Sequence, residues 1–114
     1  MMIQLMYAVE ENAYMKDGYL GISRMYQYLS QKEFDCKITE LICHGEPEIQ
    51  LKNELDMRCH YFGFSMDINS AKFIFKAAAY IKAQLPHAVI FCGSIFATCS
   101  YDLILKDCPR VCSY

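Results

Sequence analysis

YFGFS at residues 61–65 and AVIFCGS at residues 88–94 are two short apolar runs, and each stops at a small-residue turn in front of a predicted helix. The first run is hydrophobic almost throughout, which predicts a central strand buried on both faces of a parallel sheet. Open α/β sheets bind ligands where their strands end, and small residues there let a bulky ligand approach the backbone. We therefore expect a ligand site beside Ser65 and Gly93.

Strands and helices alternate along the rest of the chain. Strands are predicted at residues 3–9, 37–42, 60–65 and 88–92, with a stub of a fifth strand after Pro109. Helices are predicted at residues 19–31, from 47 to about 57, at 69–84 and at about 101–107. Strands joined by helical crossovers run parallel, so we expect a doubly wound, flavodoxin-like (Rossmann-like) α/β sheet of order 2-1-3-4 with the stub of strand 5.

Apolar spacing and capping residues give these helices their limits. The helix at residues 19–31 has an apolar stripe at three- and four-residue spacing, formed by Ile22, Met25, Tyr26 and Leu29. The helix at residues 69–84 begins at an N-cap, Asn69 or Ser70, and ends before Pro86. Residues 37–42 alternate polar and apolar side chains, which predicts a peripheral strand.

Composition narrows the function classes. A chain of 114 residues with 54% hydrophobic and 21% charged residues has the composition of one globular domain. Its net charge of -2 leaves no basic surface for a phosphate backbone, which argues against nucleic acid as a partner. No run reaches the roughly eighteen apolar residues of a membrane span, and the apolar start lacks the charges and cleavage pattern of a signal peptide. We expect a cytoplasmic protein.

Seven cysteines are present, and without a secretion signal we expect them reduced. Four lie in or beside apolar runs, where free cysteine behaves as a small hydrophobe: Cys36, Cys43, Cys59 and Cys92. The spacing of Cys99, Cys108 and Cys112 matches neither a paired zinc motif nor an iron–sulfur pattern. No metal site is predicted from the cysteines.

Three segments in order resemble one known family. Residues 17–29 are similar to its Leu-Gly segment opening the first helix, and residues 63–69 (GFSMDIN) to its Gly-Phe-Ser-x-x-x-Asn turn. Residues 90–109 are similar to its Gly-Gly-Pro-His-Ala-Thr segment and the helix that follows. Over nearly its whole length the chain resembles the cobalamin-binding domains at the amino end of many radical-SAM enzymes, as one domain, 1–114, incomplete at its C-terminus.

The resemblance implies a cofactor and its binding residues. The cofactor is cobalamin, whose nucleotide tail would lie beside the third and fourth strands and whose corrin would rest on the strand ends. The implied cofactor-binding residues are Tyr19, Gly21, Ser65, Met66, Asn69, Gly93, Ser94, Phe96 and Thr98. No residue is implied to be catalytic. The implied partner is the radical-SAM catalytic domain, of methyltransferase or cyclase type, in a parent protein.

Departures from the family pattern limit what the resemblance implies. Residues 10–18 contain no histidine, so no protein ligand is expected on the lower face of cobalt. Ser94, Ile95 and Phe96 stand where the family has glycine, proline and histidine, and no Cys-x-x-x-Cys-x-x-Cys motif is present for an iron–sulfur cluster. The chain ends where the family continues into its fifth strand, so it cannot perform radical-SAM chemistry by itself.

Two alternatives remain open. A degenerate or truncated domain would bind no cofactor and act as an interaction module, and the flank of its fourth strand would pair with a second copy to give a homodimer. A receiver-like signalling domain has the same strand order, and Glu10, Glu11, Asp67 and Ser94 imitate part of its site, but its lysine is missing. Purely structural roles would also explain these residues. Ser65, Asn69 and Thr98 could cap helices, Gly93 could serve the turn, and Tyr19, Met66 and Phe96 could be core or surface hydrophobes.

Overall fold

The computed structural model describes residues 2–10, 19–65, 70–93 and 111–113, with only the backbone described for residues 19, 20 and 111–113. The elements follow in the order β1 (Met2–Val9), α1 (Tyr19–Gln31), β2 (Asp35–Ile42), α2 (Pro47–Glu54), β3 (Tyr61–Ser65), α3 (Ala71–Gln84), β4 (Val89–Gly93) and β5 (Val111–Ser113). The predicted helix at about 101–107 lies outside the described residues.

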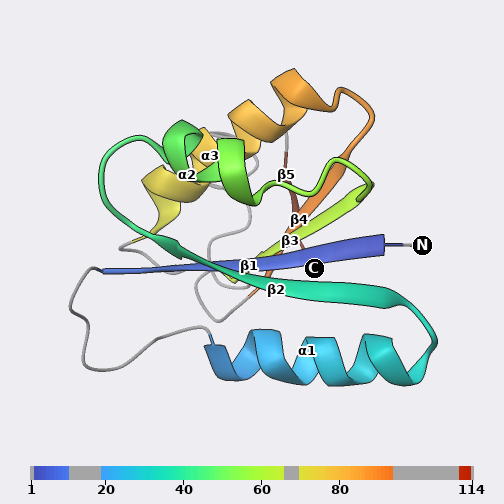
Figure 1. Cartoon of the computed structure of the whole chain (residues 1–114). Helices are drawn as coiled ribbons and strands as arrows, with labels where there is room; N and C mark the ends of the chain where they lie inside the picture. The colour runs from blue at the N-terminus through green and yellow to red at the C-terminus, as the bar shows by residue number, and fades with distance from the viewer. Residues whose placement is uncertain (1, 11–18, 66–69, 94–110, 114) are drawn as a thin grey trace.

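All strand pairs in the sheet are parallel, and the strands are ordered β2-β1-β3-β4-β5. The predicted doubly wound α/β fold is therefore confirmed, with β2 at one edge, β3 at the centre and the short β5 beyond β4. Helix α1 lies on one face of the sheet, and α2 and α3 lie on the other (Figure 1). We call these the α1 face and the α3 face.

Each face of the sheet has its own apolar core, because side chains alternate between the faces along every strand. On the α3 face, Phe62, Phe64 and Ile90 pack with the inner side of α3. On the α1 face, Leu5 and its neighbours on β1 pack with Ile22 of α1. Seven of the eight residues of β1 are buried, as expected of a strand covered on both sides.

The bounds of α1 agree with the sequence prediction, but its apolar stripe is narrower than predicted. Ile22 is buried, and Met25 and Leu29 pack against the core of the α1 face. Tyr26 is 37% exposed and is not part of that core, so its assignment to the stripe was wrong. At 100° per residue, Tyr26 lies on the flank of the stripe, where a phenol can stay partly in water.

Helix α2 ends at Glu54, earlier than the predicted end near Met57. Leu55 adopts an extended conformation, with φ -70° and ψ 123°. The next backbone amide, that of Asp56, donates a hydrogen bond of 2.9 Å to Oε1 of Gln4 in β1. A tertiary contact therefore ends this helix, and no glycine or proline in the sequence marks the place.

Gln4 is fully buried and forms the polar anchor of the α3 face. Its Nε2 donates to Oγ1 of Thr39 at 2.9 Å and to the carbonyl oxygen of Glu54 at 2.8 Å, while its Oε1 accepts from Asp56. A buried amide that lost these partners would be strongly destabilising. Gln4 thus ties β1, β2 and the α2–β3 connection together.

The start of α3 also differs in detail from the prediction. The helix begins at Ala71, and Ser70 occupies the N-cap position but makes no capping hydrogen bond with its side chain. Asn69, the other predicted cap, lies outside the described residues. The end of the helix at Gln84, two residues before Pro86, agrees with the prediction.

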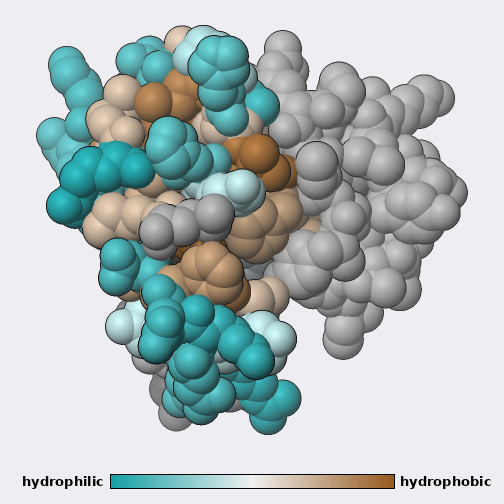
Figure 2. Space-filling model, turned by 90° about the vertical axis from the view of Figure 1, so that its right-hand side faces the viewer, coloured by the Kyte–Doolittle hydropathy of each residue, from teal (hydrophilic) through white to brown (hydrophobic). Residues whose placement is uncertain are grey.

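Figure 2 views the molecule from the end at which β1 begins, and shows hydrophobic residues between two largely hydrophilic layers. Exposed apolar side chains near this end include Met57, just before β3, and Val89, the first residue of β4. No helix among the described residues is long and apolar enough to cross a membrane.

Candidate functional site

The carboxyl ends of the strands bring four residues into one row across the sheet. Tyr7 of β1 is paired in register with Glu40 of β2 on one side and with Ser65 of β3 on the other, and Ser65 is paired with Gly93 of β4. Neighbouring parallel strands lie about 4.8 Å apart. The row Glu40–Tyr7–Ser65–Gly93, which we call the edge row, therefore crosses four strands near their carboxyl ends.

Side chains of the edge row point to the α1 face. Tyr7 belongs to the core of that face, and alternation along the paired strands places Ser65 on the same side. Ser65 is half-buried, and among the described residues its hydroxyl has no hydrogen-bond partner. Gly93 is buried and brings no side chain. The β3–β4 half of the edge row is thus small and offers one unused hydroxyl.

The α3 face is closed one residue before the edge row. The last row on that face consists of Met6, Phe64 and Cys92, and each of them is at most 1% exposed. These side chains belong to the continuous core beneath α3. At the carboxyl ends of β3 and β4, small residues therefore lie only on the α1 face.

The next row inward on the α1 face is filled by an aromatic ring. Gly63 lies between Leu5 and Phe91 in register. A Cβ added to Gly63 would come within 2.5 Å of Cε2 of Phe91 and 2.9 Å of Cδ2 of Leu5. Since real Cβ atoms do not approach so closely, glycine is required at position 63 by the packing of Phe91.

Tyr7 and Glu40 add a polar pair that the sequence analysis missed. The Tyr7 hydroxyl donates a 3.0 Å hydrogen bond to Oε1 of Glu40, and Tyr7 itself is only 5% exposed. The carboxylate thereby fixes the orientation of the Tyr7 hydroxyl within the edge row. The sequence analysis missed this pair because the two residues meet only through the register of β1 against β2, which pairs position 7 with position 40.

The nine predicted cofactor residues divide into three groups. The structure brings Ser65 and Gly93 together as register neighbours. Tyr19 and Gly21 lie in the first turn of α1, where Gly21 is exposed and a Cβ on it would meet no atom within 4 Å. The remaining five lie outside the described residues: Met66, Asn69, Ser94, Phe96 and Thr98.

The four cysteines of the described region form no disulfide and lie in or beside the core as predicted. Cys59 and Cys92 are buried, and Cys36 and Cys43 are half-buried. Burial, helped by the Asp56 carboxylate, raises the pKa of Cys59 to about 11, and burial also raises the pKa of Cys36. Thiols that stay protonated at neutral pH are poor nucleophiles and poor metal ligands.

No group of three or more histidine, cysteine, aspartate or glutamate side chains within the described ranges could hold a metal ion. In the same ranges, every buried side-chain nitrogen or oxygen has a hydrogen-bond partner. Orphaned polar atoms therefore do not mark a site in this part of the chain. What distinguishes the carboxyl ends of β3 and β4 is the small size of the paired residues Ser65 and Gly93.

A charged cluster lies at the opposite end of the sheet, around Asp56. Arg58 donates to both carboxylate oxygens through Nε at 3.0 Å and Nη2 at 2.9 Å, and its backbone N–H donates at 3.0 Å. Nζ of Lys37 lies 3.7 Å from Oδ2. The hydrogen bonds from Arg58 lower the pKa of Asp56 to about 2. This cluster stabilises the α2–β3 connection.

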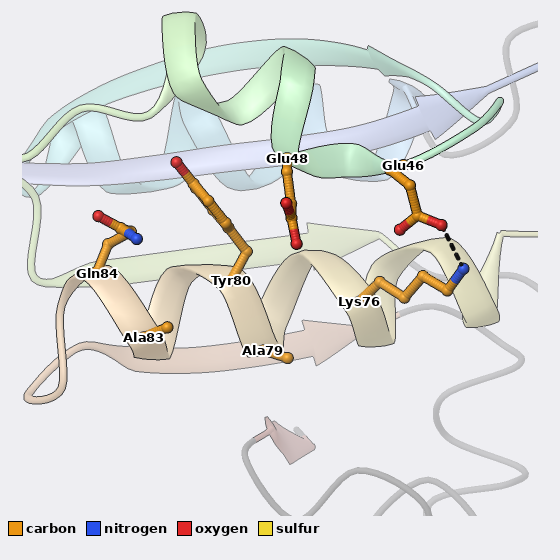
Figure 3. A pocket seen from close by; sticks show the side chains of 7 residues that line it. All are labelled: Glu46, Glu48, Lys76, Ala79, Tyr80, Ala83 and Gln84. Atoms are coloured by element: carbon orange, nitrogen blue, oxygen red, sulfur yellow. Dashed lines mark hydrogen bonds and ion pairs between the residues drawn. The ribbon is translucent and has the colours of Figure 1, made fainter.

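A shallow groove of about 550 Å³ separates α2 from α3 (Figure 3). Tyr80 and Gln84 project from α3 toward α2, and Glu48 extends from α2 toward α3. Nζ of Lys76 pairs with Oε1 of Glu46 at 3.0 Å at one end. This groove lies on the outer side of the α3 layer, so the sheet separates it from the edge row on the α1 face.

Comparison of the chain with family models, curated proteins and solved structures finds no match.

Proposed function

We propose that this chain is a cobalamin-binding domain without a lower-ligand histidine, belonging to or derived from a radical-SAM enzyme. The observation that supports it best is the pairing of Ser65 with Gly93 at the carboxyl end of a parallel sheet of order 2-1-3-4. In open parallel sheets, ligands bind in the crevice outside these strand ends. A small pair at that position is what a bulky cofactor needs for close approach to the backbone.

The binding mode follows from the open side of the edge row. The nucleotide tail would run along the α1 face between β3 and β4, because the α3 face is filled by Phe64 and Cys92. The Ser65 hydroxyl, unused among the described residues, would hydrogen-bond to the tail. Tyr19, Met66 and Phe96 are proposed to lie under the corrin.

The proposed role of the chain itself is to bind and orient the cofactor. Cobalt supplies the reactivity when cobalamin is bound, and the substrate and the radical chemistry belong to a catalytic domain of the parent protein. Within the described residues, burial raises the pKa of the Cys59 thiol to about 11, and the carboxyl of Asp56 is held by Arg58 at the far end of the sheet. We therefore assign no catalytic residue.

Retention of hydroxocobalamin tests this proposal. Purified protein is incubated with hydroxocobalamin and desalted, and the visible absorbance of the protein fraction is measured. We expect about one cobalamin per chain for the natural sequence and none for Gly93→Val, since the isopropyl group would fill the β4 end of the edge row. Val89→Leu, at the other end of the same strand, is the matched control and should retain the cofactor.

A colourless natural protein with an intact fold would contradict the proposal and favour the alternative, a domain that binds no cofactor and serves as an interaction module. Labelling of Asp67 by acetyl phosphate would instead favour the receiver-like alternative. Unchanged retention of hydroxocobalamin by a folded Gly93→Val variant would remove the edge row from the site.

The flank of β4, through which the sequence predicted a homodimer, is covered by β5 in the structure, so we propose the homodimer through the β5 side of the sheet instead. β5 contributes three residues, paired with Ile90, Phe91 and Cys92, and lies at the edge of the sheet. An edge strand presents backbone groups that can pair with another chain. Light scattering at tens of micromolar should give twice the mass of the chain, and a strict monomer would contradict this pairing.

A further inference from the structure

The Phe91 ring occupies the space above the backbone of β3. It lies so close to Gly63 that an added Cβ would be 2.5 Å from Cε2 and 2.6 Å from Cζ. The absence of a side chain at Gly63 thus lets the Phe91 ring pack directly on the backbone of β3. Leu5 of β1 bounds the same space on the other side.

This ring lies directly behind the edge row. Phe91 precedes Gly93 by two residues on β4, and Gly63 precedes Ser65 by two on β3, so all four positions share the α1 face. A flat group that enters from the carboxyl end along this face first passes Ser65 and Gly93. It then meets the edge of the Phe91 ring, because the opposite face is closed by Phe64 and Cys92.

We infer that Phe91 sets the depth of the ligand site by occupying the place that the aromatic base of a ligand would take above Gly63. This inference rests on the proposed function for the identity of the base. Binding beyond the edge row requires the half-buried ring, which packs against the core of the α1 face, to rotate away from Gly63. The aromatic base would then pack on the backbone of Gly63 in place of the Phe91 ring.

The experiment compares two corrinoids that differ in the base. Hydroxocobalamin carries the nucleotide with its aromatic base, and cobinamide lacks the nucleotide. Binding of each is titrated by visible absorbance with the natural protein, Phe91→Ala, Phe91→Leu and the control Val89→Ala, which shortens a side chain on the same strand and face. Circular dichroism first establishes that each variant is folded.

Phe91→Ala should bind hydroxocobalamin about tenfold more tightly than the natural protein does, while its affinity for cobinamide stays unchanged. Phe91→Leu should gain less affinity for hydroxocobalamin, because leucine still fills part of the space. This variant provides the test if Phe91→Ala does not fold. Val89→Ala should change neither affinity.

Each other outcome also decides. Equal hydroxocobalamin affinity in the natural protein and both Phe91 variants would overturn the role of Phe91 and leave the proposed function standing. A gain for cobinamide as large as that for hydroxocobalamin would likewise overturn it. Binding by the Phe91 variants alone would support the inference and show that the natural chain is closed to the cofactor. No binding by any variant would overturn both.

Discussion

The two faces of the sheet differ at their carboxyl end, although both are covered by helices. On the α3 face, Phe64 and Cys92 continue a close-packed core up to the strand ends. On the α1 face, the same strands end in Ser65 and Gly93, and the one large side chain behind them, Phe91, is only half-buried. The difference separates residues that stabilise the fold from the small residues at which we propose a ligand site.

Small residues at the end of the α1 face lower the stability of the fold. Removing side-chain volume from the sheet surface forfeits apolar burial of about 25 cal/mol per Å². The α3 face compensates with a larger core and with the Gln4 network, which joins β1 to the α2–β3 connection. The α1 face can then hold small residues near its edge without loss of the fold.

The largest expected effect is on the α3 face. Phe62→Ala should lower the free energy of unfolding by about 3–5 kcal/mol, because Phe62 is fully buried and its removal leaves a cavity. Tyr61→Ala, its neighbour on the α1 face, should cost only about 1 kcal/mol because Tyr61 is half-buried. Urea denaturation measures both. Equal losses would show that the two faces are equally important for stability.

Gly63 sharpens the comparison because its effect depends on Phe91. Gly63→Ala should destabilise by about 1–3 kcal/mol, since the new Cβ would overlap the ring. Gly21→Ala in α1 is the matched control and should stabilise by about 0.5–1 kcal/mol, because nothing lies near its Cβ position. Both are measured by urea denaturation.

A double-mutant cycle identifies the partner of Gly63. In a Phe91→Ala background, Gly63→Ala should cost much less than it does in the natural sequence, because the overlapping ring is gone. A cost that stays the same in both backgrounds would mean that Phe91 does not lie above Gly63.

The smallest expected effect concerns the cluster at the opposite end of the sheet. Arg58 lowers the pKa of Asp56 from 3.8 to about 2, so this group stabilises the fold fully above pH 5 and its contribution is lost as the pH falls toward 2. The contribution should be about 1 kcal/mol, less than the pKa shift alone implies, because Arg58 is 75% exposed and water screens the pair.

Arg58→Met should therefore lose this stability at pH 7 but not at pH 2, as measured by urea denaturation across that range. Lys37→Met is the control and should change the profile less, since Nζ lies 3.7 Å from the carboxylate. A difference between Arg58→Met and the natural protein that persists undiminished at pH 2 would contradict the assignment to Asp56.

Much of the fold could be predicted because its signals are local. The three- and four-residue spacing of Ile22, Met25 and Leu29 predicted α1. The continuous apolar run at residues 61–65 predicted the central strand. The end of α2 could not be predicted, because it depends on the hydrogen bond from Asp56 to Gln4, fifty-two residues away in the sequence.

Less of the candidate site could be predicted. Ser65 and Gly93 follow strand ends, and parallel topology brings such ends together, so their proximity could be expected. Tyr7 and Glu40 were missed because their hydrogen bond depends on the register of β1 against β2. The packing of Phe91 on Gly63 was missed for the same reason on β3 and β4.

Mapping backbone amide chemical shifts during titration with hydroxocobalamin tests the central claim most directly, since it reports which face of the sheet the ligand meets. We predict the largest shifts at Tyr7, Ser65 and Gly93, with the amides of Glu48 and Tyr80 in the groove between α2 and α3 unchanged. Shifts confined to that groove, or no shifts at saturating hydroxocobalamin, would contradict the assignment of ligand binding to the carboxyl end of the α1 face.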